Sequence, residues 1–238
     1  MLAGVIAALF AFAFARVFAE PQVDLAIAYE ASHEQAAMAH MAHAAPPSAP
    51  EPELVSRETQ KGLGLLTAVA LYGAAVGGVF ALVFAYAYGR WARLSPRGLA
   101  LVLAGAGFLV IALVPDLKYP PTPPAVGQHE TVALRTAAFF LMIALSVIAA
   151  LAALNVGRKL QVRLGALNAG LAAVGTYVVL ISAAQALLPK INEVPGDFPA
   201  VVLWNFRIAS LGMQAVLWLA LGIGFGVLAK RVLVRSQA

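Results

Sequence analysis

Residues 132–188 read VALRTAAFFLMIALSVIAALAALNVGRKLQVRLGALNAGLAAVGTYVVLISAAQALL, two apolar runs separated by a stretch that contains Arg158, Lys159 and Arg163. Each run is close to the ~20 residues that a helix needs to cross about 30 Å of hydrocarbon. A short connection with an excess of Arg and Lys is typical of the cytoplasmic face of a membrane. The stretch therefore predicts two transmembrane helices that are joined on the cytoplasmic side.

Four more apolar runs predict that the whole chain, residues 1–238, is a single all-α integral membrane domain. The six expected spans are Leu2–Ala19, Gly62–Tyr88, Gly98–Val114, Val132–Val156, Leu164–Leu188 and Ile208–Ala229. The composition agrees, because 62% of the residues are hydrophobic and 11% are charged, whereas a soluble domain carries about a quarter charged residues.

The charges predict how these spans are oriented. All eleven acidic residues fall in three connecting segments. In the other two connections and the C-terminal tail, every charged residue is basic. The positive-inside rule then places both termini in the cytoplasm and predicts three hairpins in series that are closed on the outer side. The net charge of +5 is explained by cytoplasmic anchors beside anionic lipid, so nucleic-acid binding is not indicated.

The first span has a second interpretation, in which it is a cleaved signal peptide. Val17-Phe18-Ala19 before Glu20-Pro21 resembles a small-residue cleavage site. The absence of Lys or Arg before the apolar run argues against cleavage, and Arg16 can extend to the interface if the helix is retained. Cleavage would leave five spans and an outer N-terminus.

The three outer segments share a pattern, with a proline where one span ends and an arginine where the next begins. Pro21, Pro115 and Pro189 are expected to end the preceding helices, since proline has no N–H to donate. The arginines are interpreted either as interface anchors or as a ring at the outer mouth that pairs with loop carboxylates. The arginines are Arg57, Arg135 and Arg207, and the expected carboxylates are residues such as Glu58, Glu130 and Asp197.

Small residues predict where the helices touch. Gly73 and Gly77, and likewise Gly222 and Gly226, are four residues apart, so that each pair shares one helix face and permits close backbone approach. Polar side chains near or within the spans, such as Gln214, are expected to form interhelical hydrogen bonds. No Asp, Glu or His lies well inside a span. A transport path would therefore be lined by backbone carbonyls or by Asn and Gln side chains.

The first outer segment, residues 20–61, combines an Ala-rich stretch expected to be helical over Val23–Ala44 with a Pro-rich linker. It carries three of the four histidines together with acidic residues, which are the ligands that late divalent metals such as cobalt, nickel and zinc accept. The candidate metal ligands are His33, His40, His43 and Glu30. A solvated helix in which histidines happen to cluster is the alternative.

Helix geometry limits this metal site. His40 and His43 are three residues apart and share a face, as do Glu30 and His33. His33 and His40 are seven apart, which is about 10.5 Å along the axis of a helix. A site with three histidines would therefore need a break in the helix, a return of the segment onto the bundle, or ligands from a partner.

Several strings in the outer segments resemble the CbtA family of proposed cobalt transporter subunits. They are Phe18-Ala19-Glu20-Pro21-Gln22-Val23-Asp24, Val114-Pro115-Asp116-Leu117-Lys118-Tyr119-Pro120-Pro121-Thr122-Pro123-Pro124-Ala125-Val126-Gly127, Leu134-Arg135-Thr136-Ala137 and Glu193-Val194-Pro195-Gly196-Asp197-Phe198-Pro199. The resemblance implies a bacterial inner-membrane protein that imports cobalt for corrinoid synthesis together with CbtB, a small subunit with one span and a His-rich segment. It implies about five spans rather than six, and it carries no assigned ligand residue.

The leading expectation is a subunit of a divalent metal importer that has no enzymatic activity and no bound cofactor. Phosphate-loop and hydrolase motifs are absent from the sequence. The alternatives are a scaffold that assembles another membrane complex without transporting anything, and a membrane-anchored metal sensor.

Overall fold

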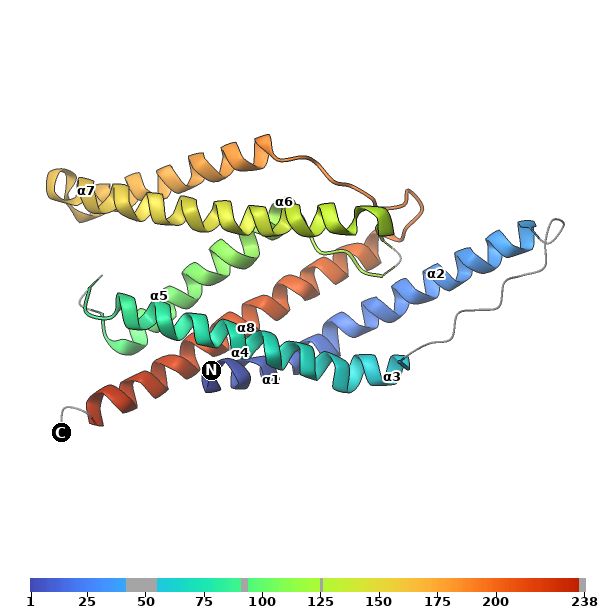
Figure 1. Ribbon diagram of the computed structural model, residues 1–238, viewed down its shortest axis with the longest axis horizontal. Coiled ribbons are helices and arrows are strands. Elements are labelled where there is room, and N and C mark those ends of the chain that lie inside the picture. Colours follow the sequence, from blue (N-terminus) through green and yellow to red (C-terminus); the bar gives the residue numbers. More distant parts are fainter. Residues whose placement is uncertain (42–54, 91–93, 125, 236–238) are drawn as a thin grey trace. The chain divides into compact units, whose positions relative to one another are not determined.

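The structure is a computed structural model that describes residues 1–41, 55–90, 94–124 and 126–235; these ranges contain helices and no strand (Figure 1). The chain divides into two compact units, one formed by residues 1–106, 122–126 and 195–238 and the other by residues 107–121 and 127–194. The α-helices are α1 (Leu2–Phe14), α2 (Glu20–Met41), α3 (Arg57–Thr59), α4 (Leu65–Ala87), α5 (Pro96–Gly107), α6 (Val114–Lys118), α7 (Val132–Leu187) and α8 (Ala200–Arg235). Short π-helical turns η1 (Ala15–Ala19), η2 (Gln60–Gly64) and η3 (Phe108–Leu113) and the 3-10 turn η4 (His129–Thr131) join them.

Within the described residues, five helices are long and apolar enough to cross a membrane, where the sequence led us to expect six. They are Leu2–Ala36, Arg57–Ala87, Pro96–Lys118, Val132–Leu187 and Ala200–Leu233. The number differs because the fourth and fifth expected spans form the single element α7. The all-helical membrane-type architecture is thus confirmed, and the count of six is not.

The chain reverses inside α7, at Gly165. This glycine has φ 76° and ψ 169°, a conformation that other residues rarely adopt, whereas the residues before and after it are helical. Arg158, Lys159 and Arg163 therefore lie in the last turns of a helix, not in the loop expected between residues 156 and 164. Figure 1 shows the two arms of α7 running back along each other.

The arms of α7 make the core of the second unit. Met142 and Ala149 of the first arm pack with Ile181 of the second, and the hydroxyl groups of Ser146 and Tyr177 are hydrogen-bonded at 2.8 Å. A second contact holds the end of the second arm, where the Lys118 ammonium donates to two carbonyl oxygens. These belong to Gln185, at 2.6 Å, and Leu188, at 2.9 Å. A cation is well placed there, because the last carbonyls of a helix have no partners within it.

Two of the three prolines expected to end a helix do not do so. Pro21 lies inside a helix that runs from α1 through η1 into α2, and Pro115 lies inside the helix that runs from α5 through η3 into α6. In both cases a π-helical turn ends two residues before the proline. The wider turn absorbs the bond that the missing N–H cannot make, so the helix continues where the sequence predicted a break. Only at Pro189 has the helix already ended, at Leu187.

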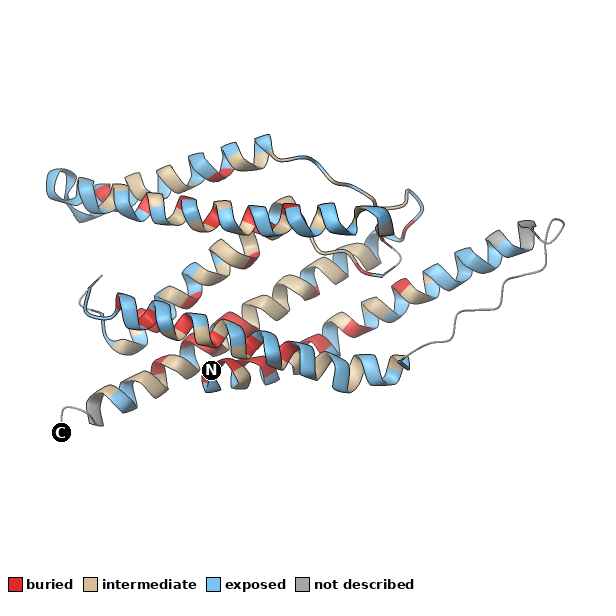
Figure 2. Cartoon of the chain, in the orientation of Figure 1, coloured by how far each residue is buried: buried red, intermediate tan, exposed pale blue. Residues whose placement is uncertain are grey.

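In the first unit α1 packs against both α4 and α8, and buried residues lie along these contacts (Figure 2). The backbones of α1 and α4 touch: a Cβ atom on Gly4 would overlap the carbonyl oxygen of Gly73. One on Gly73 would lie 2.5 Å from the Gly4 oxygen and 2.7 Å from the Ala8 Cβ, and one on Gly77 would lie 2.8 Å from the Gly4 Cα. Three glycines therefore let these two helices meet without side chains between them.

The other glycine pair lies where α8 meets α5. A Cβ on Gly222 would be 2.7 Å from the Ala104 Cβ, and one on Gly226 would be 3.1 Å from the Arg97 Cα. These spacings are tight, though less so than those around Gly4. The first residues of α5 therefore lie directly against the second half of α8.

We predict that Gly73→Ala lowers the free energy of unfolding in detergent by about 1–3 kcal/mol, because the added methyl group would push two helix backbones apart. Gly224→Ala is the matched control, since a Cβ at Gly224 meets no atom within 4 Å, and its effect should stay within about 0.5 kcal/mol. Denaturant titration of both variants gives the comparison. Equal stability of the two would contradict the close contact.

Candidate functional site

His33 makes a contact between segments that are far apart in the sequence. It lies on α2, and its Nε2 atom is 2.7 Å from Oδ2 of Asp197, in the segment before α8. Its Nδ1 atom is 3.0 Å from the carbonyl oxygen of Tyr29, one turn earlier on α2. Both ring nitrogens thus face oxygen atoms, and about half of the His33 side chain is exposed.

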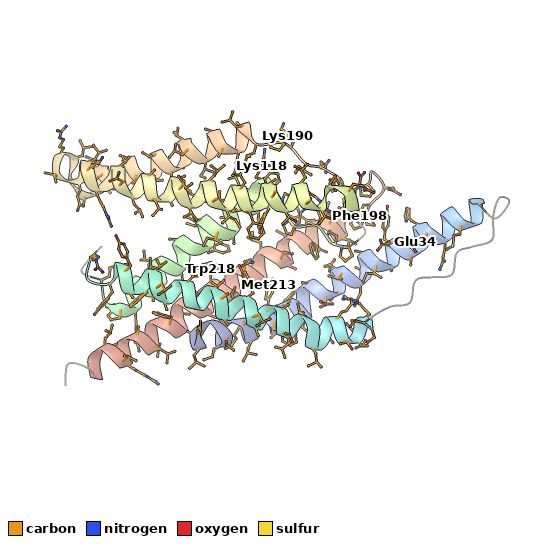
Figure 3. All side chains as sticks on the ribbon, viewed as in Figure 1. Glu34, Lys118, Lys190, Phe198, Met213 and Trp218 are labelled. Carbon is orange, nitrogen blue, oxygen red and sulfur yellow. The ribbon has the colours of Figure 1, made fainter. Side chains whose placement is uncertain are left out.

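Two aromatic rings complete this group. The ring of Tyr29 lies against the His33 ring, with 3.9 Å between centroids, and forms a T-shaped pair with the Phe198 ring at 4.9 Å. Phe198 is buried and is labelled in Figure 3. We call Tyr29, His33, Asp197 and Phe198 the His33 cluster. Phe198 anchors the segment that carries Asp197, while the polar edge of the cluster stays open to solvent.

The electrostatics of the cluster favour a charged pair. An imidazole with an oxygen at each nitrogen donates two hydrogen bonds only when it is protonated. The hydrogen bond from His33, with a second from Tyr29, lowers the pKa of the Asp197 carboxyl below its usual 3.8. Imidazole nitrogen and carboxylate oxygen are also ligands of late divalent metals, so a metal ion could take the place of the shared proton.

Of the other predicted metal ligands, the structure describes the side chain of Glu30 alone. Glu30 is exposed on α2. His40 is part of the same continuous helix, but its side chain and the whole of His43 lie outside the described residues. Among the residues that the structure does describe, no three His, Asp or Glu side chains are grouped closely enough to hold a metal ion.

Arg57 ties the start of the second apolar segment to α2. Its Nη2 atom donates to Glu20 at 2.5 Å and to Asp24 at 3.1 Å, and Glu20 is buried. The expected partner of Arg57 was Glu58. Glu58 instead forms an ion pair with Lys61 at 2.8 Å. The sequence did not predict these two ion pairs, because Glu20 and Asp24 are more than 30 residues away from Arg57.

Arg135 has a comparable place in the second unit. Its Nε atom is 3.4 Å from Oε2 of Glu193, and its Nη2 atom donates to the carbonyl oxygen of Gln128 at 3.3 Å. Gly127 lies against the guanidinium group with a φ of 114°, so neither space nor backbone conformation allows a larger residue there. Arg207 is partly buried in the second turn of α8, and Arg57 and Arg207 belong to one unit and Arg135 to the other.

Two polar atoms are buried deep in an apolar helix. The Oε1 atom of Gln214 and the Nε1 atom of Trp218 are buried on α8 with no hydrogen-bond partner among the described residues, and Trp218 is labelled in Figure 3. The interhelical bond expected to the Gln214 carbonyl is therefore absent from the part of the chain that the structure describes. The residues are four apart, so an acceptor and a donor share one helix face. Buried groups of this kind are usually satisfied by water or an ion.

Comparison with protein-family models identifies a family for this chain. A family model described as "Probable cobalt transporter subunit (CbtA)" matches residues 1–230, which is nearly the whole chain. The search of curated proteins found no match, and neither did the search of solved structures.

We predict that the His33–Asp197 contact depends on pH. The pKa of Asp197 is lowered, so its contribution is present above the unfolded-state value and is lost as the pH falls through the folded-state value, below 3.8. The Tyr29 carbonyl oxygen and then Asp197 raise the pKa of His33 above its usual 6.5, so the positive charge on the imidazole is lost only as the pH rises through that raised value. The ion pair is therefore present throughout the range from pH 3.8 to pH 6.5 and extends beyond both ends of it.

Hydrogen exchange of the backbone amides of residues 196–198, corrected for intrinsic rates, checks this. Protection should be greater at pH 5.5 than at pH 8, and Asp197→Asn should remove the difference. Glu34→Gln, the same change at an exposed position on α2, should leave it intact. Protection that is independent of pH and of Asp197 would show that the contact does not hold this segment.

Proposed function

Since the chain belongs to the CbtA family of probable cobalt transporter subunits, we propose that it is the membrane subunit of an importer for a divalent metal, namely cobalt. The family match over residues 1–230 is the observation that carries this proposal. The five long apolar helices agree with it, and together they make the chain a multi-pass membrane protein. The proposed role includes transport, not catalysis.

The arms of α7 support a topology with six crossings. A straight helix of its 56 residues would be about 84 Å long, far more than a bilayer core of about 30 Å. Folded at Gly165, each arm is long enough for one crossing. Six crossings would place both termini on one side, and the basic residues near Gly165 and at the end of α8 support the assignment of that side to the cytoplasm. The family resemblance supports a bacterial inner membrane as the location. The His33 cluster would then face outward.

Metal capture is assigned to the segment of residues 20–61. Because α2 is continuous from His33 to Met41, His33 and His40 are about 10.5 Å apart along one axis and do not share an ion. We therefore place a first position at His33, with Asp197 as its second ligand, and a further position at His40 and His43. The carbonyl oxygen of Tyr29 would orient the His33 ring by a hydrogen bond from Nδ1. Histidines that bind a metal through one ring nitrogen commonly donate a hydrogen bond from the other.

A partner would complete these positions. Two ligands from the chain leave most of the coordination sphere of a divalent ion unfilled. A small single-span subunit with a His-rich segment, of the CbtB kind, would supply imidazole ligands from outside the chain. The ion would then be shared between two subunits before it enters the membrane.

Gln214 and Trp218 are the proposed polar point along the path at depth. The amide oxygen of a glutamine can accept hydrogen bonds from the water molecules around a cation. Because the amide is neutral, its burial does not cost the energy that a buried charged side chain would cost. The driving force need not be ATP, since a divalent cation that moves inward gains about 4.6 kcal/mol per 100 mV of membrane potential.

The proposal is tested by uptake of radiolabelled cobalt into proteoliposomes that contain the chain alone or with its small partner. An imposed inside-negative potential should drive uptake, and the preparation that suffices identifies the subunits needed. The absence of uptake in both preparations, with folded and correctly oriented protein, would favour the scaffold role instead.

Capture is tested in the same assay with His40→Ala/His43→Ala. This variant should raise the cobalt concentration for half-maximal uptake several-fold while leaving the maximal rate unchanged, because capture precedes transport. His129→Ala, which removes the one histidine outside the segment, is the control. Unchanged uptake kinetics at low cobalt would exclude a capture role for these two histidines.

The path is tested separately by Gln214→Leu, which we expect to lower the maximal uptake rate several-fold with little change in the half-saturating concentration. Met213→Leu changes the neighbouring residue to a similar volume and should have little effect. If Gln214→Leu transports at the normal rate, the path does not use this side chain.

A further inference from the structure

The helix that contains Pro115 continues through the proline, but its backbone hydrogen bonds are incomplete there. The N–H of Val114 bonds to the carbonyl oxygen of Leu109, five residues back. The N–H of Tyr119 bonds to that of Pro115, four residues back. Between these two bonds lie the five carbonyl groups of residues 110–114 but only three N–H groups, since proline has none. Two carbonyl oxygens are therefore left without a partner in the helix.

These carbonyl groups lie in the interior of the second unit. Residues 110–114 are all buried or partly buried, Pro115 is buried, and η3 and α6 both contact α7. No side chain in the part of the chain that the structure describes donates a hydrogen bond to them. A backbone oxygen without a partner is costly in an apolar span, because no bulk water can reach it. The turn before Pro115 is thus a place where a ligand for oxygen atoms would be stabilised.

A carboxylate lies beside these oxygens. Asp116 directly follows Pro115 and is partly buried. Side chains on a helix lean toward its N-terminus, so the side chain of Asp116 leans back over the turn that contains residues 112 and 113. Within the described residues, Asp116 forms no hydrogen bond and no ion pair. Its charge therefore adds to the oxygen atoms that have no partner.

The nearest cation on this helix does not neutralise Asp116. Lys118 is two positions further along, so the two side chains do not share a helix face. The Lys118 ammonium group instead donates to the carbonyl oxygens of Gln185 and Leu188. The turn before Pro115 thus combines one carboxylate with two free carbonyl oxygens, and Lys118 is bound elsewhere.

From this set of oxygen atoms we propose that the second unit binds a monovalent alkali cation, sodium or potassium, at Asp116 and the free carbonyls of residues 110–114. Oxygen ligands suit hard cations, whereas late transition metals favour imidazole. One carboxylate balances one positive charge, and a divalent ion would leave an uncompensated charge in an apolar region. Carbonyl groups at interruptions of transmembrane helices are suited to such ions.

The alkali-cation site is separate from the proposed metal positions. It lies in the second unit, whereas His33 and Gln214 belong to the first. Its occupancy can be measured without cobalt and without transport, so a negative result would leave the proposed function untouched. In an importer, a bound alkali cation would provide a second ion to which metal transport can be coupled.

The test is thermal unfolding of the purified full chain in detergent, without cobalt, in sodium, potassium or choline chloride at equal ionic strength. We expect the melting temperature to be about 4 °C higher in at least one of the two alkali salts than in choline chloride, for a cation concentration about tenfold above the dissociation constant. Choline gives the baseline, because its bulk keeps it out of a site formed by one helical turn.

Two variants change the proposed ligands, and each has a matched control. Asp116→Asn should abolish the difference between the salts, because it removes the charged ligand. Pro115→Ala should reduce it, because alanine returns an N–H to the helix. Glu130→Gln removes the same charge at an exposed position of the same unit, and Pro189→Ala changes a proline that follows the end of α7. Both controls should keep the full difference.

Three results would overturn the proposal. One is an equal melting temperature of the unsubstituted chain in all three salts. Another is an equal loss of the difference in Asp116→Asn and Glu130→Gln, which would mean a general effect of surface charge. The third is a larger rise in magnesium chloride of the same ionic strength that is lost in Asp116→Asn, which would mean a site for divalent cations.

Discussion

The contact between the backbones of α1 and α4 at Gly4, Gly73 and Gly77 is the constraint on which the first unit depends. In a bilayer the lipid tails are as apolar as the helices, so association relies on close packing and not on the exclusion of water. The glycines provide that packing by removing side chains from the contact. Because α1 also packs on α8, its position determines how the remaining elements of the unit meet.

The His33 cluster follows from the same arrangement. His33 is on α2, the direct extension of α1, and Asp197 is three residues before the start of α8. The packing of α1 on α8 therefore brings together two side chains that are 164 residues apart. The ion pairs of Arg57 with Glu20 and Asp24 fix α2 to the start of the second apolar segment in a similar way.

The sequence predicted the helical membrane class and the approximate span positions, because apolar length and charge are local properties. It indicated the family through the resemblance of strings in its outer segments. It did not predict the continuity of the helices at Pro21 and Pro115, since the π-helical turns that absorb each proline have no distinctive residue pattern. It identified His33 as a candidate ligand but not Asp197 as its neighbour. That pairing depends on the packing of distant helices, which one sequence does not reveal.

The continuity of α1, η1 and α2 has a mechanical consequence. From the π-helical turn to His33 the helix extends about 24 Å, so a rotation of about 10° at η1 would move His33 by about 4 Å. That displacement would separate a contact of 2.7 Å completely. A rigid helix of this kind converts a small tilt within the membrane into a larger displacement at its far end. A force applied at that end would likewise act on the glycine contact between α1 and α4.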